Sequence, residues 1–508
     1  MEQQEQTGNY TILFTVVLGT MLAGYVSSCV NIALINIMQN FGFTMDSVVW
    51  VTLAYMLPYG STLPITGRLG DLFGRKRMYL LGLGIFTVAT LFVGLAWSKA
   101  TLILFRVFQG MGAGLLYPNS MALTSDAFPA NKRGQALGLW GALSAAGSAL
   151  GPTIGGYIVE YMNWHLIFYS ILPIAIIGLF LGLKILPESK EENASSQVDY
   201  LGGILLVVCF SCLLIALNQG NKNGWASAYI VGLFTGSALS LLAFVFVESL
   251  VAMPMIDLQL FKNFTFTISN TVGFLSYIGM YGASFLMPFY MRNIQRFPAI
   301  KAGVCLLPLP MAMVLFAPLG GRMADKLGSR ILASIGMAVM GVALFSFHFL
   351  NDRTSYPTMA WGLIVMGVGL AFTMSPLSNG VMGVLPKDKL GVGSGVFNLF
   401  KNIGGAVGVA LMGTLLDSRL TFHSVVFKNN ITIYSNPALH GLKMFQSLFI
   451  KQGYSKSDAG KAALTMLQSL ITKQAAIATY QDVFLVVAVL CALGVIPALF
   501  IKDSKKKV

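Results

Sequence analysis

The stretch GRLGDLFGRKR at 67–77 decides the fold, because a second copy, GRMADKLGSR, stands at 321–330. The copies lie 254 residues apart, about half the chain, and each follows an apolar run. Each holds a Gly, an Asp four residues on and a Gly three further: Gly67, Asp71 and Gly74, then Gly321, Asp325 and Gly328. A polar turn repeated between apolar runs predicts two related halves, and halves that move about a central cavity are typical of a transporter.

The composition places the chain in a membrane. Of its 508 residues, 56% are hydrophobic and only 10% are charged, which is too apolar for a soluble protein or soluble enzyme. The apolar runs are continuous rather than alternating, so the lipid bilayer is crossed by helices and not by a β-barrel. The net charge of +14 lies mainly in loops of one side, which is the pattern of cytoplasmic loops and excludes nucleic acid as a partner.

Runs of about 20 apolar residues predict an all-α polytopic membrane protein with fourteen spans. These are 11–34, 48–66, 79–97, 101–124, 135–159, 164–185, 200–218, 228–250, 268–291, 302–320, 331–350, 358–381, 393–416 and 482–501. Since the two turns lie on the basic side, both termini are expected in the cytoplasm.

The offset between the turns fits two six-helix halves with two extra central helices. The expected order is a cytoplasmic N-terminus (1–10), the N-terminal half (11–190), the extra pair with linkers (191–264), the C-terminal half (265–501) and a basic cytoplasmic tail (502–508). A hydrophilic segment at 417–481 is expected as a long extracellular loop. Within it, Ala459–Lys473 has the apolar spacing of an amphipathic helix that rests on the bilayer or protein surface.

The glycine–aspartate turn is a candidate gate. Its glycines permit a tight turn, and Asp71 can pair with Arg75 or face a helix N-terminus. Contacts of this kind that form in one conformation and break in the other would bias the equilibrium between the two. An ordinary charged loop that anchors orientation is the alternative.

Two further stretches interrupt apolar spans. Arg106 lies inside a span with Gln109 on the same face, and an Arg there normally faces the protein interior or a water path. Snorkelling to the helix end is the alternative. The next span carries Pro152, which bends a helix, among small residues that form a face for close packing: Gly147, Gly151, Gly155 and Gly156. A packing motif without a functional role is the alternative.

These residues resemble the major facilitator superfamily, in its fourteen-helix drug–proton antiporter branch. The turn at 67–77 is similar to motif A of that family, Arg106–Gly112 to motif B and Gly147–Gly156 to the antiporter motif C. The resemblance implies that Asp71 and Arg75 lock the cytoplasmic side in the outward-facing state. It also implies that Arg106 influences protonation, that Gly151 and Pro152 form a bend that limits leak, and that export is driven by protons.

One departure from the branch concerns its proton-coupling acid. The branch carries an Asp in the first span shortly before the stretch that here is Asn31-Ile32-Ala33-Leu34, and this chain has Val26 at that position. The charged residues expected deep in the spans are instead Arg106 and Lys401, which become the proton-coupling candidates. A basic cavity without a carboxylate favours neutral, zwitterionic or anionic solutes over permanent cations.

Polar and aromatic residues of the spans are the substrate-binding candidates, although such stripes are more often packing. They are Asn31, Tyr55, Tyr59, Gln109, Tyr117, Tyr277, Tyr281, Phe397 and Asn398. The four His have no partner at metal-ligand spacing, so neither a metal nor a cofactor is expected, and no nucleophile constellation indicates an enzyme.

The sequence thus predicts a monomeric, proton-coupled exporter of small, largely apolar molecules in a bacterial inner membrane. The alternative is a dedicated metabolite or vitamin transporter, such as a flavin importer, on the same scaffold. A non-transporting membrane sensor or membrane-embedded enzyme is a third, and it lacks a visible output domain or catalytic set.

Overall fold

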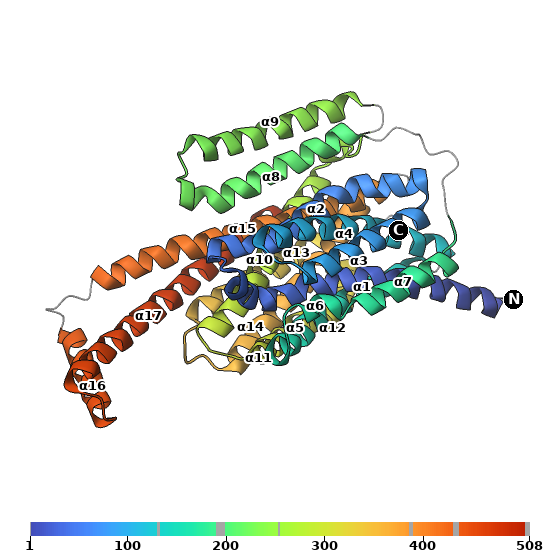
Figure 1. The fold of residues 1–508 in the computed structure, drawn as a ribbon. Helices are drawn as coiled ribbons and strands as arrows, with labels where there is room; N and C mark the ends of the chain where they lie inside the picture. The colour runs from blue at the N-terminus through green and yellow to red at the C-terminus, as the bar shows by residue number, and fades with distance from the viewer. Residues whose placement is uncertain are drawn as a thin grey trace.

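The computed structural model describes residues 2–129, 133–188, 199–251, 254–385, 390–429 and 436–502. In these ranges the chain forms a bundle of long helices (Figure 1). The first half contains α1 (Glu2–Phe41), α2 (Met45–Phe73), α3 (Arg75–Gly94), α4 (Lys99–Ala127), α5 (Arg133–Tyr161), α6 (Leu166–Tyr169) and α7 (Leu172–Ile185). Along the chain, the two halves are separated by α8 (Tyr200–Asn223), α9 (Ala228–Leu250) and the 3-10 helix η1 (Leu258–Lys262).

The second half contains α10 (Phe264–Asn293), α11 (Ala299–Leu306), α12 (Pro308–Leu327), α13 (Ser329–Ser346), η2 (Phe347–Phe349), α14 (Tyr356–Met382), α15 (Leu390–Asn429), α16 (Asn436–Lys451), α17 (Lys456–Leu493) and α18 (Val495–Ala498). Residues 503–508 of the expected basic tail lie outside the described ranges.

Twelve helical segments of the described chain are long and apolar enough to cross a membrane, so the protein is a multi-pass membrane protein. The helices α2 and α5 have 29 residues each and pack within the bundle, but they are not among the twelve. The count of fourteen spans and the cytoplasmic position of the termini therefore stay predictions.

The repeated turn has the same backbone in both halves. Gly74 ends α2 with φ 100° and Gly328 ends α12 with φ 88°, and in each case the next helix begins at the following residue. The Gly74 N–H donates to the Gly70 carbonyl and the Gly328 N–H to the Ala324 carbonyl, both at 3.0 Å. A side chain is unfavourable at this positive φ, which explains why glycine stands at both positions.

The halves are built from pairs of packed helices. In the first half α1 packs on α5, and α4 packs on α2 and α3; in the second half α10 packs on α15, and α14 packs on α12 and α13. The halves meet where α2 packs on α15 and α5 on α11. The extra pair lies on one side of the bundle, with α8 in contact with both α2 and α15 (Figure 1).

Proline interrupts two helices that were expected to be continuous. The predicted span 164–185 is divided into α6 and α7, and the predicted span 302–320 into α11 and α12. Pro173 lies in the first turn of α7, and Pro308 begins α12. Proline has no N–H to donate to the preceding turn and is favoured at the start of a helix, so it begins a new one.

The segment 417–481 differs from the expected loop. Helix α15 continues to Asn429, α16 follows, and α17 runs without a break from Lys456 into the last span. Ala459–Lys473 is therefore helical, as predicted, and it extends beyond the bundle as part of α17, with α16 at its tip (Figure 1). No Gly or Pro stands between 461 and 493, so nothing in the sequence ends the helix there.

Candidate functional site: a cavity between the two halves

A cavity of about 320 Å³ lies between the halves. The first half contributes lining residues from α1, α2, α4 and α5, and the second half from α10, α11, α12, α14 and α15. Seven of the nine predicted substrate-binding candidates line it: Asn31, Tyr55, Tyr59, Tyr117, Tyr277, Tyr281 and Asn398. The two exceptions are Gln109 and Phe397, both buried outside the lining.

Tyrosine rings form a wall on each side of the cavity. In the first half the rings of Tyr55 and Tyr59 stack with centroids 5.9 Å apart, and Tyr117 meets Tyr59 edge-on at 6.2 Å. In the second half the centroids of Tyr277 and Tyr281 are 5.8 Å apart. Each pair is spaced i, i+4 on one helix face, as the sequence predicts. Such walls suit a solute with an aromatic or other apolar surface.

Lys401 is the charged side chain among the described residues that line the cavity. It lies on α15, and its Nζ is 4.8 Å from the ring centroid of Phe397 and 5.4 Å from that of Tyr277. Phe397 thus contacts the lysine from outside the cavity lining. The described lining contains no carboxylate, so the cavity offers a cation held between aromatic rings.

Arg106, the other proton-coupling candidate, lies inside the first half. It is 1% exposed, its Nε donates to the Val51 carbonyl at 2.9 Å, and its guanidinium carbon lies 4.5 Å from the Tyr55 ring centroid. A second guanidinium nitrogen donates to Gln109 Oε1 at 2.6 Å, and Gln109 in turn donates to the Thr90 hydroxyl at 2.6 Å. These contacts rule out snorkelling for Arg106 and place Gln109 in its network instead of in the cavity.

Amide side chains add hydrogen-bond acceptors to the cavity. Asn398 donates its Nδ2 to the Ser394 carbonyl at 3.0 Å and Asn402 donates to the Asn398 carbonyl at 2.9 Å, which leaves both amide oxygens available as acceptors. On the opposite half, Asn31 Oδ1 is buried and has no hydrogen-bond partner among the residues that the structure describes. A buried polar atom without a partner is unfavourable, so a solute that donates a hydrogen bond would be stabilised there.

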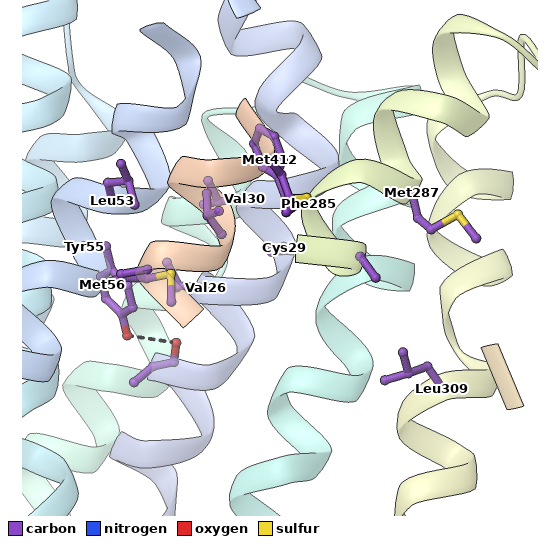
Figure 2. Close-up of a cluster of buried hydrophobic side chains, with 14 of the residues drawn as sticks. Val26, Cys29, Val30, Leu53, Tyr55, Met56, Phe285, Met287, Leu309 and Met412 are labelled. Atoms are coloured by element: carbon purple, nitrogen blue, oxygen red, sulfur yellow. Dashed lines mark hydrogen bonds between the residues drawn. The ribbon is translucent and has the colours of Figure 1, made fainter. Parts of the chain in front are cut away.

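Val26, which replaces the expected Asp, is fully buried in the apolar core. Figure 2 draws it within the cluster of buried side chains that includes Val30 of α1 and Tyr55 and Met56 of α2. The Tyr55 hydroxyl donates to the Ala23 carbonyl of α1 at 3.2 Å, which fixes one edge of this cluster (Figure 2). The adjacent Ser27 lines the cavity, so neighbouring positions of α1 have different surroundings.

The glycines of the 147–156 stretch bring α5 close to two other helices. A side chain at Gly147, Gly151 or Gly155 would collide with Met21, Ser28 or Cys29 of α1, respectively. A Cβ on Gly156 would lie 2.6 Å from the carbonyl oxygen of Ala299 in α11, which belongs to the other half. Pro152 lies within α5 and also lines the cavity. The stretch therefore packs α5 within its own half and against the second half.

At the first turn, Arg75 pairs with Asp126 at the end of α4, with 2.5 Å between the nitrogen and the oxygen. Arg77 lies 3.5 Å from Glu188, and a side chain at Gly74 would collide with Glu188. The side chains of Asp71 and Asp325 lie outside the described part of the structure. The basic residues after the turn thus tie α3 to the ends of α4 and α7.

Sequence reasoning missed the small polar residues of the cavity. They are Thr20, Ser27, Ser28, Ser144, Ser148, Ser284 and Asn402. Ser144 and Ser148 are four residues apart on α5, and the Ser144 and Thr20 hydroxyls are 2.8 Å apart across the α1–α5 contact. Small polar residues at helical spacing inside an apolar span were the signal that could have found them.

The comparison with protein families decides the identity. Residues 16–409 match the model of the Major Facilitator Superfamily. The chain belongs to this superfamily. It is accordingly a secondary transporter of small molecules and not an enzyme, which the resemblance predicted.

Relatives that are named as transporters support the predicted branch. The multidrug transporter protein MdtP of Bacillus subtilis is 29% identical over 99% of this chain and 95% of its own length. The riboflavin transporter RibZ of Clostridioides difficile is 32% identical over 84% of this chain and 92% of its own length. Multidrug transporters among the relatives are what the resemblance to the drug–proton antiporter branch predicted.

A solved structure of the same fold gives the third comparison. A POT family transporter in complex with 5-aminolevulinic acid superimposes with a TM-score of 0.65 at 16% identity, covering 96% of this chain and 94% of its own. This likeness shows the major facilitator fold, and it carries no information on the substrate.

Proposed function

We propose that this transporter exports small, largely apolar molecules of neutral or anionic charge, coupled to protons, by alternating access in a bacterial cell membrane. The observation that carries the proposal is Lys401, a cation in a cavity shared by both halves whose described lining has no carboxylate. The bacterial relatives include a multidrug transporter, a multidrug resistance protein and a tetracenomycin C resistance and export protein, which supports the compartment and the direction.

The cavity supports this substrate class through charge and shape. A permanently cationic solute would meet Lys401 with no carboxylate to offset the repulsion. An anionic or polarised group gains from the lysine, and an aromatic body gains from the tyrosine walls on both sides. A substrate that contacts both Lys401 and the Tyr55–Tyr59 wall bridges the two halves. Its binding would therefore favour the conformation in which the halves close around the cavity.

Lys401 is the better of the two proton-coupling candidates. It faces the cavity, where water and solute can reach it, and a lysine changes its charge readily when it is desolvated. Arg106 is sealed from the cavity and bonded to Val51 and Gln109, and an arginine stays charged in proteins. We assign Lys401 the exchange of protons and Arg106 the support of the Tyr55 wall.

The glycine–aspartate turns are the proposed gate at the cytoplasmic end. In the outward-facing state, Asp71 and Arg75 would lock this end, as the resemblance to motif A implies. The Arg75–Asp126 pair holds α3 and α4 together, so that the first half would move as one body.

A vitamin transporter, such as a flavin importer, is the second candidate, and its specific support is the relative RibZ, whose name gives riboflavin as its substrate. A flavin combines an aromatic ring system with hydrogen-bond donors, which fits the tyrosine walls and the unpartnered Asn31 oxygen. Growth of a riboflavin auxotroph at limiting riboflavin separates the two. Rescue by this chain would favour the second candidate.

Flux in proteoliposomes with an imposed pH gradient tests the leading proposal against a panel of cationic, neutral and anionic aromatic compounds. We expect gradient-dependent flux of neutral or anionic members, which Lys401→Ala removes. Lys184→Ala is the matched control, because Lys184 also lies over a ring, at 4.3 Å from Phe180, but on the exposed end of α7. Flux of permanent cations that survives Lys401→Ala would overturn the proposal.

A further inference from the structure

The two halves touch at the end of the bundle that lies far from the glycine–aspartate turns. Here Gly156 of α5 approaches the Ala299 carbonyl of α11, and a side chain at Gly303 would collide with Pro152. Both contacts join one half to the other, and they lie near the C-terminal end of α5 and the N-terminal end of α11. Close packing of this kind brings polar groups at the helix ends within bonding distance.

Two polar links cross the same junction in opposite directions. The Glu160 carboxylate, at the end of α5, accepts a hydrogen bond from the backbone N–H of Ala299 at 2.6 Å. Arg292, near the end of α10, donates to the Ile32 carbonyl of α1 at 3.3 Å and also to the Asn36 side chain. Glu160 belongs to the first half and Arg292 to the second, and the two opposite charges attract each other across the junction.

The position of Glu160 strengthens its link. Ala299 is the first residue of α11, an eight-residue helix whose preceding residue is Pro298 and whose cap has no side-chain hydrogen bond. The N–H groups at a helix start have no intrahelical acceptor, and the helix dipole favours a negative charge there. Glu160 is exposed and Arg292 is half-buried, so both groups can be solvated when the halves separate. The helix dipole thus stabilises the closed junction, and hydration of both charged groups offsets part of the free energy lost when the halves separate.

We propose that Glu160 and Arg292 form a latch that keeps this end closed in the present state. The latch opens whenever the transporter exposes its cavity on this side. The latch rests on the proposed alternating access. It adds two residues that set the equilibrium between the open and closed states at the end of the bundle far from the glycine–aspartate turns. Both are positioning residues, since neither lines the cavity.

Spin-label distances in nanodiscs test the latch without substrate or gradient, in a background whose native cysteines are replaced. One label pair, at Met162 and Phe349, reports on the latch end, and a second pair, at Phe73 and Leu327, reports on the turn end; all four side chains are exposed. We expect Glu160→Ala and Arg292→Ala to raise the latch-open population about tenfold, as for loss of a charge-assisted hydrogen bond. The first distance should lengthen while the second shortens.

Matched variants separate the latch from general disruption. Lys301→Ala removes a cation at the same end that lies over its own neighbour Phe297, so its distances should match the wild type. Glu160→Gln keeps the acceptor oxygen but loses the charge and should fall between wild type and Glu160→Ala, even if the alanine variants fold poorly. Unchanged distances in Glu160→Gln and Arg292→Ala, or an equal shift in Lys301→Ala, would overturn the latch. Flux of the same variants is measured separately, so failure of the latch leaves the transport proposal standing.

Discussion

Arg106 and Lys401 are two cations of the bundle interior that the sequence could not tell apart, and the structure gives them opposite surroundings. Arg106 is 1% exposed and bonded to Val51 and Gln109 inside one half. Lys401 faces a cavity that both halves share, with rings rather than hydrogen-bond acceptors beside its Nζ. A charge that is satisfied on every side stabilises its half, whereas one that faces a cavity is available to a solute or a proton.

The largest expected effect is on stability, from Arg106→Ala. The substitution leaves the Val51 carbonyl and the Gln109 amide without their partner in a buried site, which we expect to cost about 3–5 kcal/mol. Thermal unfolding in detergent, followed by tryptophan fluorescence, measures this cost, and Lys401→Ala serves as the comparison with a change below about 1 kcal/mol. Equal destabilisation by the two variants would contradict the division of roles.

Val26→Asp repeats this comparison on α1, at a position where the branch expects an acid. Val26 is fully buried among apolar side chains, so a carboxyl there lacks partners and should destabilise the protein by about 2–3 kcal/mol. Ser27→Asp puts the same group on the cavity wall, where we expect near-normal stability and new binding of lipophilic cations. Unfolding curves and tryptophan quenching by a cationic dye measure the two outcomes, and a stable Val26→Asp that binds the dye would show that the core opens there.

These cases show what the sequence could and could not supply. The apolar runs correctly predict an all-helical membrane protein, and the repeated stretch correctly predicts a glycine turn at both positions, because lipid-spanning length and glycine at positive φ are both local properties. The sequence also places Tyr55/Tyr59 and Tyr277/Tyr281 correctly on shared helix faces. It could not predict that Asn31 lines the cavity whereas Gln109 bonds to Arg106 outside it, since the helix faces that line the cavity depend on how the helices pack. It predicts a helix at Ala459–Lys473 but not that this helix continues into the last span as α17, because the amphipathic stretch and the apolar span predict separate elements.

Lys401→Ala should lower the transport rate at least tenfold, which corresponds to about 1.4 kcal/mol of activation free energy. Its unfolding temperature should stay near that of the wild type. The reason is that the variant removes the charge from the cavity but no hydrogen-bonded network. Lys401→Arg keeps the charge and should keep anion binding, but it should lose the dependence on the pH gradient, since an arginine does not exchange its proton. Gradient-driven flux in the Lys401→Arg variant would move the coupling role to another group.

A smaller effect compares the two halves at their shared turn. Gly74 and Gly328 both have a positive φ, so alanine at either position should cost about 1–2 kcal/mol of backbone strain. Gly74→Ala should cost more, because the added methyl group also collides with Glu188. Unfolding temperatures of the two variants, and of Gly74→Ala combined with Glu188→Ala, measure the difference, and the double variant should approach Gly328→Ala. A Gly74→Ala variant as stable as the wild type would show that the turn adopts another backbone conformation.

The smallest effect concerns a third cation, Lys473, which has a carboxylate partner, whereas the described lining around Lys401 contains no carboxylate. Lys473 pairs with Asp352 at 2.9 Å and ties α17 to the loop before α14. The hydrogen bond from Lys473 holds the pKa of Asp352 below its ordinary value of 3.8. The pair therefore contributes stability above that value and loses it as the pH falls through the lowered pKa, where the carboxyl becomes protonated. At neutral pH we expect Asp352→Asn to unfold at a slightly lower temperature than the wild type. This difference in unfolding temperature should disappear in acid. The effect is small because both side chains are about one-third exposed, and an ion pair at the surface contributes little stability. A difference in unfolding temperature that stays constant below pH 3.8 would show that the contact stabilises through packing instead of charge.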